Sequence, residues 1–205
     1  SLEFCLLISI PSAVGLYILS EPIIYILFER GAFVNKDTLI TARVLSKFAL
    51  GLPAYILIKV LLTCFFARED TKTPLYVSIV SVVVNIILSL ILIQSMQEIG
   101  IALATAISAW INALFLYIML RIRNNISLDT RLIISGYKII ICSIVMGVTC
   151  YFLKLILLPH IILHSNILNF LVLIVAITIN QIIYIIMIFM LKVLTIDELK
   201  RYIKK

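Results

Sequence analysis

The chain has 205 residues, of which 63% are hydrophobic and 13% are charged, and its formal net charge is +7. Its mean hydropathy is +1.22, whereas a soluble domain carries about 45–50% apolar and about 25% charged residues. A water-soluble globule of this size has no room to bury so much apolar surface, which excludes a cytosolic enzyme, a disordered tail and a coiled coil. We therefore expect an all-α polytopic membrane protein.

Six stretches are long and apolar enough to cross a hydrocarbon core of about 30 Å, which takes roughly 20 helical residues. Their length and their lack of alternation indicate helices rather than barrel strands. We expect a break in the first span at Ser20-Glu21-Pro22, because proline favours the first turn of a new helix. The predicted spans are Phe4 to Ser20 with a short continuation from Ile23 to Phe28, Phe48 to Ala67, Leu75 to Ile93, Ile99 to Leu120, Leu132 to Leu158 and Ile167 to Leu191.

Lysine and arginine are distributed unequally between the two sides of these spans. The loops after the second and fourth spans, the C-terminal tail and the start of the fifth span (Lys138) hold eleven of them, and the opposite side, with Lys154 near the end of the fifth span, holds five. Because cytoplasmic loops are enriched in Lys and Arg, we expect the first side, and with it both termini, to be cytoplasmic. The loop between the first two spans carries four of the five opposing charges, which counts against this orientation.

Two shorter segments and the chain start complete the predicted organisation. Residues 122–131 are expected to form a cytoplasmic loop. Residues 192–205 are expected to form a basic amphipathic tail on the cytoplasmic membrane surface, with a frayed basic tail as the equal alternative. The chain begins Ser1-Leu2-Glu3-Phe4 with no initiator Met, which favours a fragment or a split-gene product.

Lys59 is the residue that points most directly to function. It lies nine positions before Arg68, about 13 Å along a helix and so near the midplane of the membrane. A lysine at that depth is costly unless it faces a polar interior, so we favour a functional cavity over snorkelling to the interface. Pro53, six residues earlier in the same span, predicts a kink, either mobile or static.

A charged turn, Arg68 to Pro74, separates the second and third spans. Thr73 is expected to cap the next helix and Pro74 to open it. The turn is either a solvated hairpin or a cytoplasmic gate whose charged members are Arg68, Glu69, Asp70 and Lys72.

Small or polar residues recur at every fourth position of the fourth span, and this stripe permits close packing against another helix. Its members are Gly100, Ala104, Ser108 and Asn112. Buried amides, at Asn85, Asn112 and Asn180-Gln181, are expected to form hydrogen bonds between helices.

Neither an enzyme nor a metalloprotein is indicated. Glu69 and Asp70 lack the partner acids of a diphosphate-binding motif, and His160 and His164, four residues apart, have no accompanying Glu or Cys. The four cysteines form no C-x-x-C pair, so we expect no metal and no cofactor. No basic patch is interleaved with aromatic residues, which argues against nucleic-acid binding.

Four motifs follow one another along the first part of the chain. They are Phe28-Glu29-Arg30-Gly31-Ala32-Phe33, Gly51-Leu52-Pro53-Ala54-Tyr55 leading to Lys59-Val60-Leu61, Phe66 to Pro74, and Gly100-Ile101-Ala102-Leu103-Ala104-Thr105. In their order and spacing they resemble the MurJ/MviN lipid II flippases over about residues 1–121, and Pro11-Ser12-Ala13 in the first span also fits this resemblance.

The resemblance implies a part of the fourteen-helix multidrug/oligosaccharidyl-lipid/polysaccharide exporter fold, in which two six-helix lobes are followed by two extra helices. The chain would supply helices nine to fourteen: residues 1–121 as the last four of the second lobe, and residues 132–191 as the extra pair, with a groove for the polyprenyl tail. It also implies that Lys59 lies in the substrate cavity, that the turn from Arg68 to Lys72 is cytoplasmic, and that Glu29 and Arg30 lie at the outer rim.

The function implied by the resemblance is part of a lipid II flippase of the bacterial inner membrane, working by alternating access. Its partners would be the lipid-linked peptidoglycan precursor, membrane lipids and the missing N-terminal half. A polysaccharide-repeat flippase or another transporter of the superfamily is the first alternative. An antiporter favours an intramembrane carboxylate, and no span from Phe48 onward contains one. A non-transporting scaffold for cell-wall synthesis is the second alternative, and it gives no reason to bury Lys59.

Overall fold

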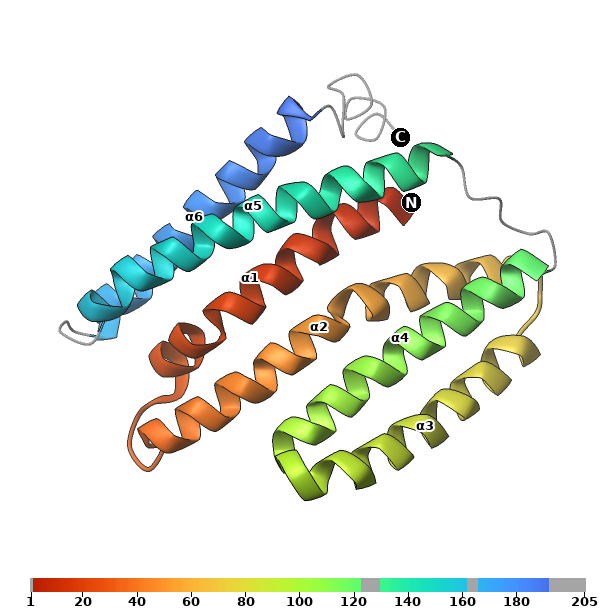
Figure 1. Ribbon diagram of the computed structural model, residues 1–205, viewed down its shortest axis with the longest axis horizontal. Coiled ribbons are helices and arrows are strands. Elements are labelled where there is room, and N and C mark those ends of the chain that lie inside the picture. Colours follow the sequence, from red (N-terminus) through yellow and green to blue (C-terminus); the bar gives the residue numbers. More distant parts are fainter. Residues whose placement is uncertain (1, 123–129, 162–165, 192–205) are drawn as a thin grey trace.

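The computed structural model describes residues 2–122, 130–161 and 166–191, and within them it consists of helices joined by short turns (Figure 1). The predicted tail, most of the predicted 122–131 loop and the side chains of His160 and His164 lie outside the described residues. The helices are α1 (Leu2–Phe28), α2 (Asn35–Phe66), α3 (Lys72–Met96), α4 (Glu98–Ile122), α5 (Thr130–Ile161) and α6 (Asn166–Met190).

All six helices are long and apolar enough to cross a membrane, which confirms the predicted all-α polytopic class. Large apolar side chains cover their outward faces, such as Leu90 on α3 and Ile156 on α5, both 63% exposed. Lipid tails are as apolar as these side chains, so the exposed apolar surface is stable in contact with a bilayer.

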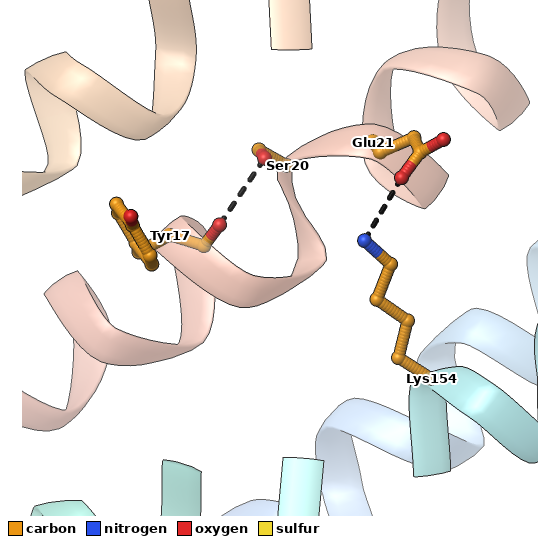
Figure 2. A network of polar contacts seen from close by, with 4 residues as sticks. All are labelled: Tyr17, Ser20, Glu21 and Lys154. Atoms are coloured by element: carbon orange, nitrogen blue, oxygen red, sulfur yellow. Dashed lines mark hydrogen bonds and ion pairs between the residues drawn. The ribbon is translucent and has the colours of Figure 1, made fainter. Parts of the chain in front are cut away.

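The predicted break at Ser20-Glu21-Pro22 is wrong, because α1 is one helix that continues through these residues to Phe28. Proline removes one backbone hydrogen bond but keeps a helical φ, so the chain bends without leaving the helix. Figure 2 shows the ribbon of α1 changing direction between Ser20 and Glu21, and the Ser20 hydroxyl there donates to the Tyr17 carbonyl at 3.2 Å.

The second helix begins thirteen residues earlier than the predicted Phe48, at Asn35. Asp37 stabilises this start, because its carboxylate accepts a hydrogen bond from the Val34 amide at 3.1 Å. Hydropathy missed the first turns because they carry Lys36, Arg43 and Lys47. With 32 residues, α2 is about 48 Å long, which exceeds a hydrocarbon core of about 30 Å.

The helices form two groups that share the contact between α1 and α2 (Figure 1). In one group, α4 packs against both α2 and α3. In the other, α5 packs against α1 and α6, so α1 lies between α2 and α5. The first group is built on Leu61, Phe65, Val77, Leu116 and Leu120, and the second on Cys142, Met146, Tyr184 and Ile188 with Leu7 and Val14 of α1 against them.

Candidate functional site

Lys59 lies on α2, inside the apolar run bounded by Lys47 and Arg68. Its side chain is exposed, and the part of the chain that the structure describes offers it no hydrogen-bond or ion-pair partner. Leu61, two positions on, packs into the core shared with α4, and two positions correspond to about 160° around a helix. Lys59 therefore projects from the face opposite this core, where an anionic group can reach it.

Residues next to Lys59 shape the same stretch of α2. Tyr55 lies one turn earlier, packs beside Ala54 and Ala109, and keeps its hydroxyl buried. Pro53 is buried inside the helix, and Figure 1 shows α2 changing direction roughly midway along its length. This segment therefore combines an available cation with the residue type that bends helices.

The turn between α2 and α3 is held by backbone and carboxylate hydrogen bonds. The Phe65 carbonyl accepts from the amides of Arg68, at 3.0 Å, and Asp70, at 3.1 Å. The Asp70 carboxylate accepts from the Thr73 amide at 3.1 Å and from the Thr73 hydroxyl at 2.7 Å. The expected cap at Thr73 is therefore wrong: α3 already begins at Lys72, and Asp70 binds the first-turn donor.

Three charged residues of this turn are exposed: Arg68, Glu69 and Lys72. Glu69 has a φ of +59°, a left-handed conformation that is uncommon for any residue other than glycine. The chain reverses direction within a few residues at this point, with charged side chains projecting outward. A gating role for them stays a prediction.

Glu29 and Arg30 lie in the connection between α1 and α2. The Glu29 carboxylate accepts a hydrogen bond from the buried Thr38 hydroxyl. The Arg30 guanidinium donates to the Ile26 carbonyl at 3.3 Å, satisfying one of the free carbonyls in the last turn of α1. Gly31 has a φ of +62°, which glycine adopts at little cost. These contacts fix the shape of the connection, and a place at the outer rim stays a prediction.

The four-residue stripe lies on the buried side of α4. Gly100, Ala104 and Ser108 are buried, and the buried Oδ1 of Asn112 has no hydrogen-bond partner among the described residues. A Cβ on Gly100 would lie 2.5 Å from the Leu92 carbonyl oxygen. Glycine at this position is therefore what permits the approach of α4 to the backbone of α3.

The polar contacts that sequence reasoning missed concentrate on α1, α5 and α6. The Lys154 ammonium lies 2.9 Å from the Glu21 carboxylate (Figure 2), and the Tyr184 hydroxyl donates to the Leu7 carbonyl at 2.7 Å. The sequence offered one indication of the ion pair, which is that Glu21 and Lys154 are charged residues inside apolar stretches. Asn180 fits the expected interhelical role, because its Oδ1 accepts from the Thr149 hydroxyl at 3.1 Å. Asn85 does not, because its Oδ1 accepts from the Ser89 hydroxyl of the same helix at 3.0 Å.

A pocket of about 280 Å³ lies between α1, α5 and α6. Its walls are mostly apolar and include Leu16, Leu19, Met146 and Ile177, while Asn180 and Gln181 supply polar groups. Its chemistry suits a hydrocarbon chain. Among the described residues, no cluster of three or more His, Cys, Asp or Glu could hold a metal ion.

These features define a multi-pass α-helical membrane protein, in which Lys59 is exposed within an apolar span and has no partner among the described residues. The family model "Lipid II flippase MurJ" matches residues 1–175. The chain belongs to the MurJ family of lipid II flippases.

Curated relatives support the same assignment. The chain is 40% identical over 149 residues to "Probable lipid II flippase MurJ" of Rickettsia prowazekii (strain Madrid E), covering 73% of the chain and 29% of the relative. It is 42% identical over 147 residues to the protein so named in Rhizobium tropici, covering 72% and 28% respectively. To "Lipid II flippase MurJ" of Thermosipho africanus (strain TCF52B) it is 42% identical over 116 residues, covering 57% and 24%. The chain thus spans less than a third of the length of these relatives.

Proposed function

We propose that this chain forms part of a lipid II flippase, which moves the undecaprenyl-diphosphate-linked peptidoglycan precursor across the bacterial inner membrane. Membership in the MurJ family and the printed names of its relatives support this proposal. The observation that carries it is Lys59, an exposed cation in an apolar span with no partner among the described residues.

In this proposal the Lys59 ammonium contacts the anionic diphosphate of the substrate. An intramembrane lysine is costly unless it faces a polar cavity or a counter-ion, and a crossing diphosphate supplies the counter-charge. Repeat-built transporters rock two halves about a central site, so the second half of the cavity would come from the N-terminal helices. Transport of this kind needs no covalent chemistry.

The remaining features take places around this cavity. The pocket between α1, α5 and α6 would hold part of the polyprenyl tail, which stays in the lipid while the headgroup crosses. The exposed charges of the turn after α2 would form a cytoplasmic gate, with both ends of the segment in the cytoplasm. Glu29 and Arg30 would lie at the outer rim.

Complementation tests this proposal. A bacterium depleted of its own lipid II flippase would express this chain alone, the N-terminal helices of a relative alone, or both together. We expect growth and normal cell shape only with both parts, because each supplies half of the cavity. If the two parts are inserted and stable but give no rescue, the lipid II proposal fails and transport of another lipid-linked saccharide takes its place.

A further inference from the structure

We propose that the Glu21–Lys154 ion pair is a positioning device that holds α5, and with it α6, against the bend in α1. The inference concerns the assembly of the bundle and does not depend on which substrate is transported.

The two charges meet where α1 bends. Glu21 directly precedes Pro22, and its carboxylate lies 2.9 Å from the Lys154 ammonium (Figure 2). Each residue is seven positions before the end of its helix, which is about 10 Å. The pair therefore joins α1 and α5 at the same level, toward the same end of the bundle.

Shielding from solvent strengthens the pair. The Lys154 side chain is 19% exposed and the Glu21 side chain 39% exposed, and both interrupt apolar spans. A lone charge in such a setting is costly, and removing one partner leaves the other uncompensated. The pair is therefore stable only while α5 stays against α1.

The ion pair completes a regular seam on α1. Leu7 accepts the hydrogen bond from Tyr184 of α6, and Val14 lies where a Cβ on Gly147 of α5 would come within 2.9 Å of it. Leu7, Val14 and Glu21 are spaced by seven residues, so they share one face of the helix. The first two contacts fix the earlier part of α1, and the ion pair fixes its bent end.

Cys150 reports on this seam directly. It lies one turn before Lys154, is fully buried, and lines the same pocket as Leu19 and Ile23, which flank Glu21. If α5 separates from the bend in α1, the Cys150 thiol becomes accessible. Its rate of reaction with a maleimide is thus a readout that needs no transport.

The test uses membranes containing the assembled transporter with Cys150 as the only cysteine of this chain, after replacement of Cys5, Cys64 and Cys142 by Ala. We expect Glu21→Lys or Lys154→Glu to raise the labelling rate by about tenfold or more, because two like charges push the helices apart. The double exchange, Glu21→Lys with Lys154→Glu, should return the rate to within about twofold of the parent, which is the coupling expected of a direct pair.

A matched control separates the pair from a general change of charge. Glu98→Lys makes the same charge change at an exposed position at the start of α4, and it should leave Cys150 protected. Where a charge reversal prevents insertion, the milder Lys154→Gln replaces it, with a smaller rise expected. Unchanged protection in Lys154→Gln or the reversals overturns the proposal, and so does a double exchange that labels as fast as the single variants.

Discussion

Lys59 and Lys154 both lie in apolar spans of the same chain, yet their surroundings are opposite. Lys154 is mostly shielded and paired with Glu21 at 2.9 Å. Lys59 is exposed and has no partner within the described residues. Since an uncompensated charge in an apolar span is costly, the fold explains the first lysine, and the proposed diphosphate of the substrate would compensate the second.

The two helix groups that carry these lysines differ in the same way. Polar contacts between side chains, or from a side chain to a backbone carbonyl, join α1, α5 and α6 at several levels. The contacts among α2, α3 and α4 rest mainly on apolar and small residues, such as Ala54, Ala109 and Gly100. This group of α2, α3 and α4 also holds a polar contact between helices, from the Trp110 indole of α4 to the Leu50 carbonyl of α2 at 3.0 Å. The contrast therefore rests on the two lysines: Lys154 is paired between helices, and Lys59 is not.

Reversing the charge of Lys59 should have the largest effect. In the complementing pair, Lys59→Glu should abolish flipping, Lys59→Ala should lower it by roughly tenfold or more, and Lys59→Arg should retain most of it, because positive charge is the required property. Lipid II translocation and thermal unfolding would be measured in parallel. Wild-type flipping by Lys59→Ala would falsify the cavity role.

Adding one methyl group at Gly100 should show how strongly the group of α2, α3 and α4 depends on close packing. Gly100→Ala places a Cβ 2.5 Å from the Leu92 carbonyl oxygen and should cost about 2 kcal/mol of unfolding free energy. Gly136→Ala is the matched control, because a Cβ there meets nothing within 4 Å, and it should stabilise α5 by up to about 1 kcal/mol. Thermal denaturation in detergent should therefore show a lower unfolding temperature for Gly100→Ala and a higher one for Gly136→Ala.

Removing one member of the ion pair should have a smaller effect. Lys154→Met leaves Glu21 without its partner and should lower stability by about 1–2 kcal/mol, below the cost for a fully buried pair because both side chains retain some exposure. Glu21→Gln in the same background should recover part of that loss. A double variant that loses the sum of the two single effects would mean that the charges do not interact.

The smallest effect is expected from the hydrogen bond between α6 and α1. Tyr184→Phe removes the donor to the Leu7 carbonyl and should cost about 1 kcal/mol. Tyr151→Phe is the control, because Tyr151 is 53% exposed on α5. Equal unfolding temperatures for the two variants would argue against a stabilising role for the Tyr184 contact.

The sequence was sufficient to predict the number and approximate positions of the helices, because crossing a bilayer requires long apolar runs. It failed where polar residues are helical, as in the first turns of α2, and where proline bends a helix without ending it, as at Pro22. The Asp70 cap was missed for a related reason, since Thr73 and Asp70 both suit that role and only the backbone geometry decides between them.

The candidate site likewise has one part that the sequence could predict and one part that it could not. The depth of Lys59 could be read from its distance to flanking charges, a local property of one helix. The Glu21–Lys154 pair joins residues 133 positions apart, and no spacing rule connects α1 to α5. Only the packing of the helices brings the two charges together.

The length of α2 gives its bend a mechanical consequence. Asn35 lies eighteen residues before Pro53, so this arm of the helix is about 27 Å long. A rotation of about 10° at the bend would move the far tip by about 5 Å, given that length. In such a rotation the arm would act as a lever: a small movement at Pro53 becomes, at the Asn35 end, a displacement comparable to the width of a side chain.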